Sequence, residues 1–277
     1  MIQEEQVMSD ASADETRSIV RDHYAKVSTG ASGCAPGCCA VMPADQSRML
    51  GYSAEELAQL PEGADMGLGC GNPQVIASLR PGETMLDLGA GGGFDCFLAA
   101  RVVGPTGRVI GVDMTPEMVT LARANARKVN ATNVEFRLGE IEHLPVADGS
   151  VDVILSNCVI NLSPDKPAVF REAFRVLRVG GRLAISDVVA TAPIPPELRT
   201  QAAALAGCIS GAAPIDDVRR MLSEAGFTSI EIKIAPRSAE IVGSWLAGAE
   251  RFIASATIEA RRGAEKPRAC CEPGCCA

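Results

Sequence analysis

The chain has 277 residues, of which 47% are hydrophobic and 22% charged, with a formal net charge of −8 at pH 7. These values are ordinary for a globular protein, and an acidic chain lacks the basic face that nucleic acid requires. The sequence contains no apolar run of the roughly 18 residues that span a bilayer, and its acidic start lacks the apolar core of a signal sequence. We therefore expect a cytoplasmic protein without nucleic-acid or membrane partners.

The N-terminal part combines a helix with cysteine-bearing loops. Residues 14–27 have the apolar spacing of a helix. Residues 29–43 are typical of a flexible loop and carry three cysteines, and the glycine-rich residues 66–73 hold Cys70. We interpret residues 1–70 as a helical, cysteine-bearing segment.

Residues 71–190 alternate between strand and helix patterns. Strands are expected at residues 84–88, 108–112, 134–138, 151–156 and 182–186, and helices at residues 94–103, 115–130 and 166–177. Strands separated by helices of this length predict a doubly wound, Rossmann-like α/β sheet.

The chain beyond residue 190 looks like an addition to this sheet. A proline-rich linker at residues 193–196 precedes patterns for helices at 197–209 and 215–225 and a strand at 229–234. We expect a C-terminal α+β region over residues 191–262. A polar, cysteine-rich tail follows at residues 263–277, and we expect it to be flexible.

A glycine-rich loop lies between the first strand and the helix after it. Asp87, Gly89, Gly91 and Gly93 occupy this turn, where glycines permit the close approach of a ligand. Asp113 ends the next strand, where a carboxylate accepts hydrogen bonds from ribose hydroxyls. The combination predicts an adenosyl cofactor, and a purely structural glycine turn is the weaker alternative.

Residues 71–187 resemble the S-adenosylmethionine-dependent methyltransferases. The likeness is carried by residues 86–93, 151–157 and 170–181, which match the glycine loop, the fourth strand and the helix and turn after it. The resemblance implies that S-adenosylmethionine is the cofactor. It also assigns further residues to the cofactor site, namely Met114, Glu140, Ile141, Glu142 and Asn157, of which 140–142 enclose the adenine ring.

The eleven cysteines need a separate explanation. A reducing compartment disfavours permanent disulfides, so they should be buried hydrophobes, metal ligands or reactive thiols. Cys96 lies in an apolar helix pattern and suits burial. The vicinal pairs at 38–39, 270–271 and 275–276 lie in Pro- and Gly-rich segments and do not suit it.

Four cysteine contexts resemble those of the arsenite methyltransferases, and the likeness extends over nearly the whole chain. They are Cys39 in the pair 38–39, Cys70 in 69–73, Cys158 in 156–163 and Cys208 in 206–211. The resemblance implies that Cys158 and Cys208 hold As(III), that Cys70 is the third thiolate, and that Cys39 or Cys38 acts in early steps. The implied activity is methyl transfer to arsenite, or to its thiol conjugates, for arsenic detoxification.

Soft thiolates suit this substrate because As(III) prefers sulfur over oxygen or nitrogen. The arsenic lone pair can attack the methyl carbon without losing a proton, so we assign no catalytic role to His23 or His143, the only histidines. Attack formally oxidises arsenic, so turnover should need a thiol reductant such as glutathione or thioredoxin. We expect a monomer. Leu68 departs from the family pattern, which often has an aromatic residue there.

One seven-residue string occurs twice, at residues 34–40 and 271–277, and the copies differ only at their second position. The tail cysteines could capture As(III) and pass it inward, or the tail could have no catalytic role. Two other functions stay open: a thiol-rich protein that sequesters As(III) or another metal, and a methyltransferase acting on a quinone-like molecule. The cysteines lack the C-x2-C pairs of structural zinc sites.

Overall fold

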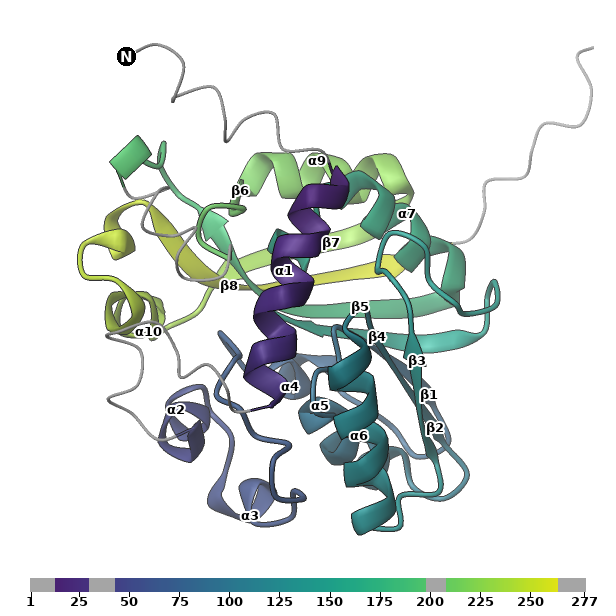
Figure 1. Cartoon of the computed structure of the whole chain (residues 1–277). Coiled ribbons are helices and arrows are strands. Elements are labelled where there is room, and N and C mark those ends of the chain that lie inside the picture. The colour runs from purple at the N-terminus through teal and green to yellow at the C-terminus, as the bar shows by residue number, and fades with distance from the viewer. Residues whose placement is uncertain (1–12, 30–42, 198–207, 264–277) are drawn as a thin grey trace, which may run out of the picture.

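The computed structural model describes residues 13–29, 43–197 and 208–263, which build a twisted sheet with helices on both faces (Figure 1). The strands follow the order β3-β2-β1-β4-β5-β8-β7, with β6 beside β5. Their bounds are β1 Thr84–Leu88, β2 Arg108–Asp113, β3 Val134–Leu138, β4 Val151–Asn157, β5 Leu177–Ala190, β6 Ala213–Pro214, β7 Phe227–Ile234 and β8 Ile253–Arg262.

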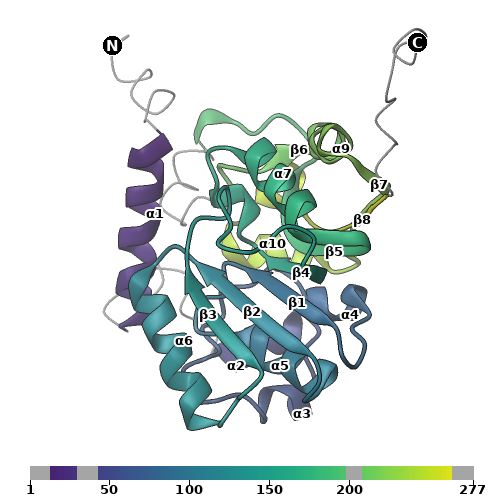
Figure 2. The same ribbon diagram turned by 90° about the vertical axis from the view of Figure 1, so that its right-hand side faces the viewer.

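The helices cover both sides of this sheet (Figure 2). Their bounds are α1 Ala13–Ser28, α2 Pro43–Met49, α3 Ala54–Leu57, α4 Pro73–Ala77, α5 Phe94–Val103, α6 Pro116–Lys128, α7 Lys166–Val176, α9 Ile215–Ala225 and α10 Ser238–Trp245, with short 3-10 turns at η1 Ile160–Leu162 and η2 Ala249–Arg251. The predicted doubly wound α/β fold is confirmed. The predicted helix at 197–209 lies almost entirely outside the described residues.

The C-terminal region is appended through the sheet itself. Strands β1 to β5 pair in parallel, whereas β8 runs antiparallel between β5 and the edge strand β7. Strand β8 is not predicted from the local sequence, because its buried positions are mostly alanine and serine and carry little strand preference. This strand brings C-terminal residues next to the parallel core.

Two apolar layers bury the faces of the sheet. One face carries Leu86, Leu88, Ile154 and Ile185 and packs against α7 and α9. The other carries Met85, Val153 and Leu155 and packs against α4, α5 and α6. Continuous apolar runs in the central strands therefore reflect burial on both sides.

Helix α1 packs beside α6 (Figures 1 and 2). The Arg17 guanidinium reaches across to Glu140 at 3.3 Å and Glu142 at 3.4 Å, beyond the end of β3. This contact ties the N-terminal helix to the edge of the sheet where the parallel strands end. No helix within the described ranges is long and apolar enough to cross a membrane.

Candidate active site

The glycine loop turns tightly at the carboxyl end of β1. The Gly89 and Ala90 amides both donate to the Val112 carbonyl, at 2.8 and 3.0 Å. Gly89 has φ +70, and a Cβ there would lie 2.4 Å from Cγ2 of Val159. Gly93 has φ +94 and packs under Phe97 and Phe136 at the start of α5. Glycine is therefore required here by both conformation and space.

Asp113 lies at the end of β2 and braces this loop. Its carboxylate accepts hydrogen bonds from the Gly91 amide at 2.9 Å and from the Thr115 amide at 2.9 Å. Burial nonetheless raises the pKa of Asp113, while these two amides oppose the rise. A partly desolvated carboxylate beside a glycine loop suits the hydroxyls of a ribose.

A cavity open to solvent follows this edge, with an empty volume of about 1090 Å³ that includes its mouth. Most of the predicted cofactor residues line it: Gly89, Gly91, Asp113, Met114, Ile141, Glu142 and Asn157. Three do not. Asp87 is buried beneath the loop, where its Oδ2 accepts from the Cys96 thiol at 3.3 Å. Gly93 is covered by two phenylalanines, and Glu140 points to Arg17 and Arg21.

Sequence reasoning missed several residues that line the cavity. Tyr24 comes from α1 and Tyr52 from the loop before α3, and these are the only tyrosines in the chain. Arg17, Met66 and Met118 line it too. Tyrosines are scarce in a chain with 4% aromatic residues, so both could have been considered as site residues. No motif or spacing in the sequence, however, connects them to the glycine loop.

Tyr52 belongs to a polar network in the wall of the cavity. Its hydroxyl donates to Oδ1 of Asp95 at 2.8 Å and accepts from Nδ2 of Asn157 at 3.2 Å. Nε2 of Gln74 also donates to Oδ1 of Asp95, at 3.2 Å. Burial raises the pKa of Asp95, and the hydrogen bond from Tyr52 is the largest effect that opposes it.

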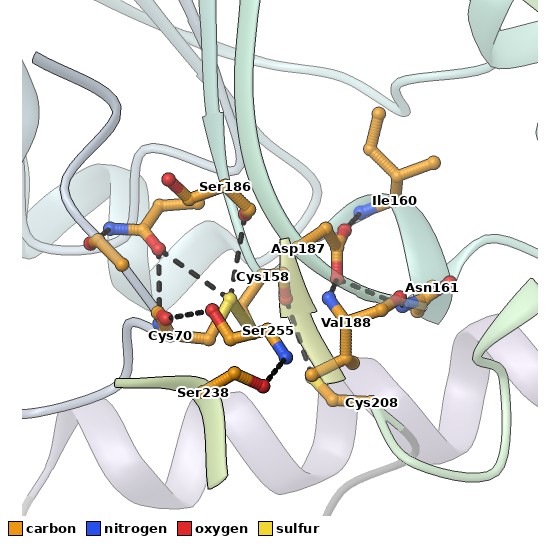
Figure 3. Close-up of a disulfide and its surroundings, with 12 residues drawn as sticks. Cys70, Cys158, Ile160, Asn161, Ser186, Asp187, Val188, Cys208, Ser238 and Ser255 are labelled. Atoms are coloured by element: carbon orange, nitrogen blue, oxygen red, sulfur yellow. Dashed lines mark hydrogen bonds between the residues drawn. A yellow bond between two sulfur atoms is a disulfide. The ribbon is translucent and has the colours of Figure 1, made fainter. Parts of the chain in front are cut away.

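Two of the predicted arsenic ligands, Cys70 and Cys158, are joined by a disulfide (Figure 3). Free thiols are expected from the sequence at both positions, and the disulfide contradicts this expectation. Their Cα atoms lie 5.7 Å apart, an ordinary separation for a disulfide, because the loop before α4 folds over the end of β4. Cys96 and Cys208 are the free cysteines among the described residues, and Cys96 is buried as expected.

Cys158 sits in an unusual backbone conformation with φ +58. Its amide donates to the Ser186 carbonyl at 2.8 Å. The Asp187 carboxylate then accepts from the Ile160 amide at 3.0 Å and from Nδ2 of Asn161 at 2.8 Å. Burial raises the pKa of Asp187 to about 6, against these hydrogen bonds. A non-glycine residue with positive φ persists only where its surroundings hold it.

Cys208 reaches the same place from beyond the linker. Its thiol donates to the Cys158 carbonyl at 3.3 Å (Figure 3). Burial raises the pKa of Cys208 to about 12, Asp187 adds to the rise, and Lys166 opposes it. The structure thus joins the sulfurs of Cys70 and Cys158 and sets the Cys208 thiol against the Cys158 backbone. The ligand atoms of Cys70, Cys158 and Asp187 lie within 4.8 Å of one another. Cys39, Cys38 and the tail cysteines lie outside the described residues.

The donor set fits an adenosyl sulfonium cofactor. The glycine turn, the Asp113 carboxylate and the apolar side chains of Met114, Met118 and Ile141 line one cavity, and acceptor and apolar wall are what ribose hydroxyls and an adenine ring require. This fold and this site are those of the S-adenosylmethionine-dependent methyltransferases. The chain matches the methyltransferase domain family over residues 79–226.

Comparison with curated proteins narrows the class. The arsenite methyltransferase of Halobacterium salinarum is 51% identical over 271 residues, covering 93% of this chain and 69% of that protein. The arsenite methyltransferase of Aquipseudomonas alcaligenes is 42% identical, covering 76% of this chain and 61% of that protein. The chain belongs to the arsenite methyltransferase family.

Solved structures agree with this assignment. The arsenic(III) S-adenosylmethionine methyltransferase of Chlamydomonas reinhardtii superposes with a TM-score of 0.61 at 34% identity, covering 82% of this chain and 76% of that one. A phosphoethanolamine N-methyltransferase of Haemonchus contortus, solved with S-adenosylhomocysteine, has a TM-score of 0.60 at 18% identity. The second likeness shows a shared fold only.

Proposed function

We propose that this chain methylates As(III) bound by the thiolates of Cys70, Cys158 and Cys208. One observation carries the proposal: Cys158 lines the cofactor cavity and also contacts both other cysteines. Arsenic held there would lie next to the cavity, where its placement alone favours reaction. The relatives named above act on arsenite by name, which supports the same substrate.

Each part of the site has a separate task. When bound, S-adenosylmethionine supplies an electrophilic methyl group on its sulfonium. Asp113 and the glycine loop hold the adenosine half, and the three cysteine sulfurs orient the arsenic lone pair toward the cavity. No side chain has to remove a proton from arsenic, and the described residues that line this cavity include no histidine.

The thiols must be reduced before they bind arsenic. Reduction of the Cys70–Cys158 disulfide takes two electrons and two protons, which glutathione or thioredoxin would supply as thiols. The same reductant would return oxidised arsenic to As(III) after each transfer. Such reductants belong to a cytoplasmic setting, and we assign the chain to it as a monomer.

Cys39 and the repeated tail string remain outside this geometry. We keep Cys39, or its neighbour Cys38, as the thiol for early steps. The tail follows β8, whose last residues lie at the edge where the parallel strands begin, away from Cys158. Deleting residues 269–277 tests whether the tail captures arsenite, because unchanged methylation at limiting arsenite would contradict capture.

The central experiment incubates the full chain with methyl-labelled S-adenosylmethionine, arsenite and glutathione, and separates the arsenic products. Labelled methylarsenicals that disappear in Cys158→Ser support the proposal. Tight arsenite binding without a labelled product would favour sequestration. A labelled quinone instead of an arsenical would favour the other alternative. Both alternatives are less favoured, because they leave either the cofactor cavity or the cysteines unexplained.

A further inference from the structure

The backbone of Cys70 is held at both of its polar groups. Its amide donates to Oδ1 of Asn157 at 3.1 Å, and its carbonyl accepts from the Ser255 hydroxyl at 2.8 Å. Ser255 is itself fixed, because its amide donates to Oγ of Ser238 at 2.9 Å. Figure 3 shows the two hydrogen bonds that link Ser238 to Ser255 and Ser255 to Cys70. A side-chain hydrogen bond from β8 therefore holds a loop that lies 185 residues earlier in the chain.

The residues on either side of Cys70 lie against the same surface. A Cβ on Gly69 would be 2.8 Å from Nδ2 of Asn157, and a Cβ on Gly71 would be 2.8 Å from Oγ of Ser186. Asn157, Ser186 and Ser255 come from β4, β5 and β8 and form what we call the polar floor. The two glycines let the loop lie directly on this floor.

The polar floor relates Cys70 to Cys158. The Ser186 carbonyl accepts from the Cys158 amide at 2.8 Å and lies 3.5 Å from Sγ of Cys70. Cys70 is fully buried, so its carbonyl has no bulk water to replace a lost donor. The position of Cys70 Sγ thus depends on the hydroxyl that holds its carbonyl.

We propose that Ser255 is a positioning residue, whose hydroxyl places the Cys70 sulfur against the Cys158 sulfur. This inference rests on the proposed function, because the advantage of a preassembled thiol pair is that it binds As(III) at a smaller entropic cost. Ser255 lies outside the cavity lining, so its effect should appear in thiol chemistry and not in cofactor binding.

The test measures the thiol–disulfide equilibrium of Cys70 and Cys158 in the full chain with glutathione. In this exchange the two thiols reduce one glutathione disulfide to two glutathione thiols, and alkylation with peptide mass spectrometry quantifies the pair. Ser255→Ala should lower the equilibrium constant about fivefold, the effect of one buried hydrogen bond. Ser255→Thr keeps the hydroxyl and should therefore have the equilibrium constant of the wild type.

Ser156→Ala is the matched control. Ser156 is also fully buried in the sheet, and its Oγ has no hydrogen-bond partner within the described part of the chain. This variant should leave the equilibrium unchanged. If Ser255→Ala does not fold, Ser238→Ala loosens the same strand and should lower the constant by a smaller factor. If neither Ser255→Ala nor Ser238→Ala changes the equilibrium constant of the Cys70–Cys158 pair, the proposal is overturned.

Arsenite titration separates this inference from the proposed function. Trp245, the only tryptophan, packs on the same apolar cluster as Cys208, so its fluorescence can follow arsenite binding. Ser255→Ala should weaken arsenite binding about fivefold and leave S-adenosylmethionine affinity unchanged. If the wild type does not bind arsenite, the proposed function is refuted. If Ser255→Ala still shifts the disulfide equilibrium in that case, the positioning role is supported.

Discussion

The Cys208 thiol donates a hydrogen bond to the Cys158 carbonyl at 3.3 Å, although fifty residues separate the two cysteines. This contact joins the region beyond the linker to the end of β4. It places the Cys208 thiol against the backbone of Cys158, whose sulfur is paired with that of Cys70.

Replacing this third sulfur tests the ligand set. Cys208→Ser should weaken arsenite binding on the order of tenfold or more, because oxygen is a poorer ligand for soft As(III). S-adenosylmethionine affinity should stay unchanged, since Cys208 does not line the cofactor cavity. Trp245 fluorescence and calorimetry measure the two affinities. Cys96→Ser is the control for arsenite binding, because Cys96 is a free buried cysteine whose thiol contacts Asp87 and none of the three predicted arsenic ligands. Equal arsenite affinity in Cys208→Ser and the wild type would remove Cys208 from the set.

Asp113 should give cofactor binding a pH dependence. Its pKa is raised by burial, so lowering the pH protonates its carboxylate earlier than that of an exposed aspartate. Protonation removes an acceptor for the ribose hydroxyls, and S-adenosylmethionine affinity should therefore fall as the pH decreases. Asp113→Asn should bind about tenfold more weakly and show little pH dependence. Calorimetric titrations from about pH 7 down to about pH 4, which reach the ordinary range of an aspartate, measure this. A wild-type affinity that stays flat over this range contradicts the assigned role.

Gly89 is the point where the glycine loop meets Val159, the residue after Cys158. Gly89→Ala should destabilise the protein by about 2–4 kcal/mol, combining positive φ with a clash against Val159. Gly149→Ala is the control, because Gly149 has φ +55 and nothing within 4 Å of its would-be Cβ. The control should cost only about 1 kcal/mol. Urea unfolding compares the two, and adding Val159→Ala should recover part of the loss in Gly89→Ala. Equal costs for both glycines would show that the clash is unimportant.

Tyr52 supports Asp95, a buried carboxylate in the wall of the cavity. Tyr52→Phe should reduce the free energy of unfolding by about 1–3 kcal/mol, because Asp95 loses a buried donor. The pKa of Asp95 should rise further, since the Tyr52 hydroxyl now lowers it. Tyr24→Phe serves as the comparison: among the described residues no hydrogen bond of its hydroxyl is seen, so its loss of stability should be smaller. Denaturant titration of both variants decides the matter, and a larger loss in Tyr24→Phe would contradict this account.

Local sequence was sufficient for the parallel core. The five strands of the central sheet and the helices between them were predictable, because burial on both faces produces continuous apolar runs. The glycine loop and Asp113 were equally visible, since a tight turn restricts residue type whatever the rest of the chain does. The cysteine contexts at 70, 158 and 208 pointed to arsenic by resemblance.

Tertiary structure decided how these parts meet. Strand β8 carries no strong local signal, yet it supplies Ser255 to the polar floor. Asn157 could be assigned to the cofactor site by resemblance, but only the folded chain turns its amide toward the Cys70 amide. Contacts between residues 87 or 185 positions apart leave no periodicity in the sequence. Sequence alone determined the parallel core of the sheet and the chemistry of its side chains, and packing across distant strands determined which of these side chains meet.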